Sequence, residues 1–92
     1  MRERDIERHL VERVKALGGE VRKVQWIGHR GAPDRLVMFP AYMVSKSNCW
    51  VELKAPGVKP EPHQLREHAR MYRMGELVHV IDSIEAVERL LA

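Results

Sequence analysis

The sequence predicts a mixed α/β fold in which a four-stranded sheet is flanked by helices, in the order αβββαβα. Three observations lead to this prediction. Apolar residues recur at helical spacing near the start of the chain, at Ile6, Leu10, Val14 and Leu17. Short apolar runs bounded by glycine, proline or polar residues follow, as expected of strands. A second helical pattern separates the last two runs, so that they form a right-handed βαβ unit if their strands are parallel.

The composition is that of a small globular protein. The chain has 92 residues, of which 45% are hydrophobic and 32% charged, and we expect a single domain over 1–92. So short a chain buries a limited core, and dimerisation would add to its stability. The formal charge of +3 permits a polyanionic partner. With no membrane-spanning run, no signal peptide and a single cysteine, Cys49, we expect a cytoplasmic protein without a membrane partner.

Breaker and capping residues set the expected bounds of the elements. The first helix is predicted over 3–17 and ends at Gly18-Gly19, where a glycine suits the left-handed cap. The last helix is predicted over 84–91, with Ser83 as its N-cap. The strands are predicted over 20–27, 34–39, 49–54 and 77–81.

The second helix is predicted over 61–74, with a proline in its first turn. Its buried stripe is expected to consist of Leu65, Ala69 and Tyr72 (or His68). The arginines of this helix would then lie on its other faces.

The strand 49–54 carries the chemistry that organises the chain. Alternation places Glu52 and Lys54 on one face with Trp50, and the apolar residues between them on the other. Covering such charges is costly unless they are paired or bound to a metal. Pro33 delivers a second carboxylate, Asp34, to the start of the preceding strand. Two acids and a lysine on neighbouring strands suit metal-dependent phosphodiester cleavage, whereas a solvated ion pair and a turn aspartate are the structural alternatives.

The first helix supplies a third acid. At about 100° per residue, Glu7 falls within the apolar sector that runs from Ile6 through Leu10 and Val14 to Val11, so it points toward the sheet. Glu3 also falls in this sector but lies at the frayed end of the helix. The alternative for Glu7 is a carboxylate that reaches solvent from the edge of the apolar stripe.

These motifs resemble those of the PD-(D/E)XK nuclease superfamily. Pro33-Asp34 corresponds to the "PD" and Glu52-Leu53-Lys54 to the "EXK", with seventeen residues between the two acids. Together with Gln64 in the following helix, the pattern looks most like the VRR-NUC branch, over residues 3 to 82. The resemblance implies a restriction-endonuclease-like core in a stand-alone nuclease of the kind found in phages and bacteria.

The resemblance also implies roles for the site residues. Asp34, Glu52, the main-chain carbonyl of Leu53 and a helix acid, Glu7 before Glu3, would bind the metal. Such oxygen ligands favour Mg²⁺ or Mn²⁺. Lys54 would activate the attacking water and stabilise the phosphate, and Gln64 would position water or phosphate.

The implied activity is that of a metal-dependent, structure-specific endodeoxyribonuclease. Stand-alone members of this branch look like homodimeric resolvases of four-way (Holliday) junctions. A flap, nicking, repair or restriction-like nuclease is an alternative, as is a non-catalytic DNA-binding module of the same fold. Phosphate contacts are expected, by their place in the loops and helix near the site, from Arg30, Lys59, Arg66, Arg70 and Arg73.

The apolar run 36–44 suggests where two copies would meet. We expect the dimer interface to include Phe39, Tyr42 and Met43, because a monomer would leave part of this surface wet. A hairpin packed against the first helix would explain the same residues.

Overall fold

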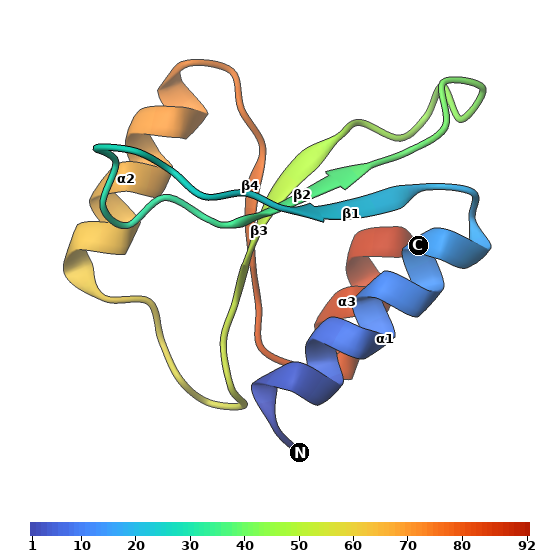
Figure 1. Cartoon of the computed structure of the whole chain (residues 1–92), viewed down its shortest axis with the longest axis horizontal. Helices are drawn as coiled ribbons and strands as arrows, with labels where there is room; N and C mark the ends of the chain where they lie inside the picture. Colours follow the sequence, from blue (N-terminus) through green and yellow to red (C-terminus); the bar gives the residue numbers. More distant parts are fainter.

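The computed structural model describes all residues, 1–92, and has the predicted order αβββαβα (Figure 1). The helices are α1 (Glu3–Ala16), α2 (Pro62–Arg73) and α3 (Ile84–Leu91). The strands are β1 (Glu20–Lys23), β2 (Arg35–Met38), β3 (Cys49–Leu53) and β4 (Val78–Ile81). None of the helices combines the length and the apolar character that crossing a membrane requires.

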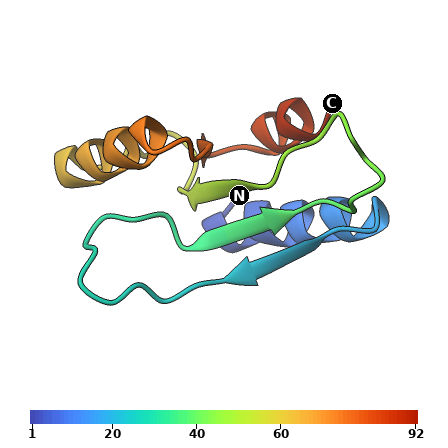
Figure 2. The ribbon, with the colours of Figure 1, turned by 90° about the horizontal axis from the view of Figure 1, so that it is seen from above.

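The strands form one mixed sheet in the order β1-β2-β3-β4 (Figures 1 and 2). The pairings β1–β2 and β2–β3 are antiparallel, and β3–β4 is parallel with α2 in the crossover. This confirms the mixed four-stranded sheet. In the register of β2 and β3, Arg35 lies opposite Val51 and Leu36 opposite Trp50.

Strand β1 is shorter than its predicted range of 20–27 and ends at Lys23. The main chain follows β2 for one more hydrogen bond, in which Val24 N–H donates to the Asp34 carbonyl at 2.8 Å. The chain then turns away, and the indole N–H of Trp26 donates to the carbonyl of Pro33 at 2.8 Å. Trp26 therefore belongs to the loop beside the sheet, which explains the imperfect alternation of this segment.

The core lies between one face of the sheet and the helices α1 and α3. Ile6, Leu10 and Val14 of α1 are completely buried there, as the helical periodicity predicts. Burial of side chains of this kind contributes about 1.5–3 kcal/mol each. The rest of the core comes from the central strands, β4 and α3: Val37, Cys49, Val51, Leu53, Ile81, Ala86, Val87 and Leu91. Helix α3 begins as predicted, because the Ser83 hydroxyl accepts a hydrogen bond from Ala86 N–H at 3.0 Å.

The buried face of α2 differs from the predicted stripe. Leu65 and Tyr72 are 53% and 70% exposed, and Ala69 is also exposed. The buried residues are Glu67, Met71 and His68, which was the alternative member of the stripe. The reason is that α2 covers a polar face of the sheet, where its side chains meet Glu52 instead of the apolar core.

The segment 40–48 folds back against the ends of α1 and α3. Phe39 is partly buried against the core, and the Tyr42 hydroxyl lies 3.5 Å from the carbonyl oxygen of Leu17. The Lys46 ammonium donates to the carbonyl of Leu91 at 3.1 Å. Phe39 thus fits the packed alternative in part, whereas Tyr42 remains 76% exposed.

Candidate active site

The alternation of β3 presents Glu52 on the face opposite the core. Val51 and Leu53 are buried in the core, and Trp50 and Glu52 are half-buried on the other side. Because Arg35 lies opposite Val51, one further step in the antiparallel register brings Asp34 opposite Glu52. The two carboxylates therefore share one face of the sheet.

Lys54 completes this group directly after β3, where its main-chain N–H still donates to the carbonyl of Ile81 at 3.0 Å. Its ammonium nitrogen lies 3.9 Å from Glu52 Oε2, and the two side chains are only 15% and 12% exposed. The end of β3 thus holds a carboxylate and an ammonium group side by side, both largely shielded from solvent. The structure brings together the Asp34, Glu52 and Lys54 side chains that the sequence singled out.

Glu52 lies in an environment that disfavours its charged form. The pKa of Glu52 is raised to about 7, chiefly by burial and also by the neighbouring charges of Asp34 and Glu3, against the opposing effect of Lys54 and Arg35. Additional positive charge beside Glu52 would therefore stabilise the ionised carboxylate.

Helix α2 places two polar side chains over Glu52. Gln64 donates from Nε2 to Glu52 Oε2 at 3.4 Å, while its own Oε1 accepts from Glu61 N–H at 2.8 Å and fixes the amide. One turn later, His68 Nε2 lies 3.7 Å from Glu52 Oε1. This nitrogen is buried and has no hydrogen-bond partner.

His68 was not predicted as a site residue. Burial lowers its pKa, and Lys54 adds to this effect against Glu67 and the main chain of Gly31, so the imidazole is neutral at pH 7. The signal in the sequence is its position four residues after Gln64, which places both side chains on one face of a helix.

Arg35 was also not predicted as a site residue, and its ion pair with Glu7 changes the role expected of that acid. The Arg35 side chain is buried and forms ion pairs with Glu7 and, at 2.7 Å, with Asp34 Oδ1. Glu7 does point toward the sheet, but its carboxylate is held by Arg35. Glu3 is the acid of α1 whose charge acts on Glu52.

The donors on this face fit a hard divalent cation. No three side chains of His, Cys, Asp or Glu gather into a metal-binding group. Two carboxylates and a main-chain carbonyl are nevertheless a normal set for Mg²⁺, which keeps several water ligands. Asp34 and Glu52 would hold such a cation together with the Leu53 carbonyl that the resemblance implies, and the unpartnered His68 Nε2 offers a hydrogen-bonding position beside Glu52.

The basic residues expected at phosphate are exposed, in two loops and on α2. Arg30 is in the loop before β2 and Lys59 in the loop before α2. Arg66, Arg70 and Arg73 are exposed on α2, with Arg70 paired to Glu67 at 2.6 Å.

A mixed sheet that presents Asp34, Glu52 and Lys54 on one face is of the restriction-endonuclease-like class. A solved structure described as "VRR_NUC domain" matches with a TM-score of 0.82 and 41% identity, over 97% of this chain and 92% of that one. "Putative nuclease p44" of Acyrthosiphon pisum secondary endosymbiont phage 1 is 49% identical over 83 residues, 90% of this chain and 85% of the phage protein. A scan of family models gave no match. The chain belongs to the VRR-NUC family of the PD-(D/E)XK nuclease superfamily.

Proposed function

We propose that the protein is a metal-dependent endonuclease that hydrolyses phosphodiester bonds in DNA. The observation that carries the proposal is the half-buried group of Asp34, Glu52 and Lys54 on one face of the sheet. The family, and the phage relative that is named a nuclease, support the same activity.

In this proposal Asp34, Glu52 and the Leu53 carbonyl hold Mg²⁺ or Mn²⁺. The bound cation would supply Lewis acidity and lower the pKa of water. Lys54 orients the attacking water and stabilises negative charge on the phosphate. Gln64 restrains Glu52 by its hydrogen bond and, with His68, offers polar contacts to water or phosphate.

The acids of α1 have different proposed roles. Glu7 acts through Arg35, whose guanidinium fixes Asp34 at the edge of β2. Glu3 adds to the negative field at Glu52 and would bind the cation through water.

The proposed substrate is branched DNA, with a four-way junction favoured. Resolving a junction requires two cuts on symmetry-related strands, and a two-fold homodimer offers two sites in that relation. The exposed Tyr42, with Met43 and the partly buried Phe39, is the surface proposed for the dimer. Phosphate contacts are proposed from Arg30, Lys59, Arg66, Arg70 and Arg73.

The activity is tested by incubating the protein with labelled four-way junction, flap, splayed-arm and linear duplex DNA, with Mg²⁺, Mn²⁺ or EDTA. We expect metal-dependent cleavage of the junction that is lost in Asp34→Asn and Glu52→Gln. Lys15→Ala, on the exposed side of α1, is the control. Binding of DNA without any cleavage would indicate a non-catalytic DNA-binding module. Cleavage of flaps alone would contradict the assignment as a junction resolvase.

A further inference from the structure

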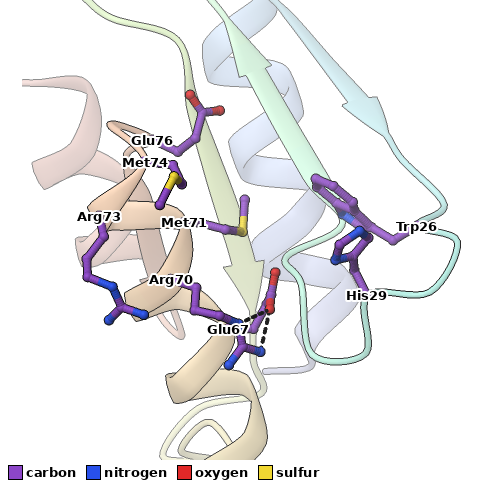
Figure 3. A pocket seen from close by; sticks show the side chains of 8 residues that line it. All are labelled: Trp26, His29, Glu67, Arg70, Met71, Arg73, Met74 and Glu76. Carbon is purple, nitrogen blue, oxygen red and sulfur yellow. Dashed lines mark hydrogen bonds and ion pairs between the residues drawn. The ribbon is translucent and has the colours of Figure 1, made fainter.

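A pocket of about 410 Å³ lies between α2 and the loop that joins β1 to β2 (Figure 3). Trp26 and His29 line it from the loop, and Met71, Met74 and Arg73 line it from the helix. We propose that this pocket binds one unpaired nucleobase of the DNA next to the cleavage site. The inference rests on the proposed nuclease function and specifies the substrate of that site.

The pocket offers a fixed aromatic surface. The Trp26 ring packs on Trp50 with centroids 5.0 Å apart and a tilt of 48°, and its indole N–H is anchored on Pro33. His29 meets Trp26 edge-on at 5.7 Å. Met71 is buried, and Met74 is 79% exposed at the rim. Aromatic and thioether groups of this kind suit the flat face of a base.

The charges of the lining favour a base within the pocket and phosphate at its rim. Arg73 forms no ion pair in the structure and is free to meet a phosphate, and Arg70 lies beside it on the helix. The carboxylates of Glu67 and Glu76 would repel phosphate from the interior. One oxygen of each is already bonded, Glu67 Oε1 to Arg70 and Glu76 Oε1 to the Trp50 indole.

The remaining oxygens of Glu67 and Glu76 are hydrogen-bond acceptors. Adenine, cytosine and guanine carry amino donors on their pairing edges, whereas thymine offers one N–H between two carbonyls. The pocket should therefore accept a base with an amino group in preference to thymine.

The pocket adjoins the catalytic group. Trp50 precedes Glu52 by two residues on the same face of β3, a separation of about 6.6 Å. On α2, Glu67 is the neighbour of His68, which contacts Glu52. A base in the pocket would therefore belong to a nucleotide beside the phosphate at Glu52. A stacked and paired base cannot enter, so the occupant comes from a branch or an unpaired end.

The test measures binding of fluorescein-labelled flap DNA by anisotropy, with Ca²⁺ as the cation and a gel to verify that the strands stay intact. The unpaired nucleotide at the branch is adenosine, thymidine or an abasic residue. We expect about tenfold weaker binding of the abasic flap than of the adenosine flap, the scale of one stacked base, with thymidine between them. Aminopurine at the same position should lose fluorescence on binding, because it stacks on Trp26.

Met74→Glu should remove this preference, because it places a carboxylate at the rim of the pocket. Tyr72→Glu is the matched control: its side chain is 70% exposed on the same helix outside the pocket, and it receives the same charge. Equal affinity of the natural protein for abasic and adenosine flaps would contradict the binding of a base in the pocket, even if the protein cleaves DNA. Base-dependent binding with no cleavage in Mg²⁺ would instead contradict the nuclease function and support the binding of a base in the pocket.

Discussion

The Lys54 ammonium lies 3.9 Å from Glu52 Oε2, at the outer limit of an ion pair. At this separation the ammonium forms no hydrogen bond with Glu52, so its N–H donors remain available to water and phosphate. Removing a catalytic lysine lowers the rate of cleavage, whereas removing a lysine that only forms an ion pair does not.

Lys54→Ala should retain the fold and DNA binding but lower the rate of cleavage by about 10²-fold or more, the usual scale for a proton-transfer or electrostatic group. Single-turnover cleavage separates the chemical step from binding, with circular dichroism to verify the fold. Undiminished cleavage would assign Lys54 to an ion pair with Glu52 and nothing more.

His68 provides a second comparison at the scale of one side chain. His68→Phe removes the polar atom beside Glu52 and should lower kcat by about tenfold, whereas His68→Gln should recover part of the loss. KM should change little if His68 holds a reacting group in place and does not bind DNA. An undiminished kcat in His68→Phe would show that only the space filled by His68 matters.

The sequence predicted Asp34, Glu52, Lys54 and Gln64 because each stands at a recognisable place in a motif. It did not predict Arg35 or His68. Arginine follows Asp34 on a strand where alternation turns it toward the core, and a buried arginine is expected only when its partners are known. Those partners, Glu7 and Asp34, are 28 residues and one residue away in sequence, and only the folded chain brings both to one guanidinium.

All seven elements were predicted, since each is a segment of regular periodicity bounded by breaker or capping residues. The errors concerned which face of a helix is buried and where a strand ends. Periodicity identified α1 correctly because an apolar stripe faces an apolar core. The same reasoning failed for α2, where the buried side is polar and Leu65 and Tyr72 remain outside.

The contact between α1 and α3 includes a surface ion-pair group. Glu88 of α3 accepts hydrogen bonds from Arg13 at 2.9 Å and interacts with His9 at 2.8 Å, both on α1. These partners, Arg13 first, lower the pKa of Glu88 to about 2 from an ordinary value of 4.5. Because the folded pKa is the lower one, the stabilisation is complete above 4.5 and is lost as the pH falls to about 2.

Glu88→Gln should therefore lower the thermal midpoint by a few degrees at pH 7, and the difference from the natural protein should disappear below the folded pKa. Thermal unfolding followed by circular dichroism at several pH values gives this comparison. Glu12→Gln, on the exposed side of α1, should have little effect at any pH. A difference that persists in strong acid would mean that Glu88 acts by packing.

At the scale of the whole molecule, the proposed resolution of junctions requires two chains to associate. We expect light scattering at micromolar concentration to give about twice the chain mass of 10.7 kDa. Tyr42→Glu should produce monomers, because it places a charge in the proposed interface. Tyr72→Glu is the control, since the two tyrosines are 76% and 70% exposed. A natural protein of 10.7 kDa in solution, with no preference for junctions over linear DNA, would contradict the dimeric resolvase.

The packing of Trp26 on Trp50 has an optical consequence. The chain contains two tryptophans, and the pair joins the loop before β2 to the strand that carries Glu52. Two indoles 5.0 Å apart and inclined at 48° couple their electronic transitions and give a paired positive and negative band in circular dichroism. That band would disappear if the loop left the sheet while the helices stayed intact. The protein thus contains its own spectroscopic reporter for the geometry beside Glu52.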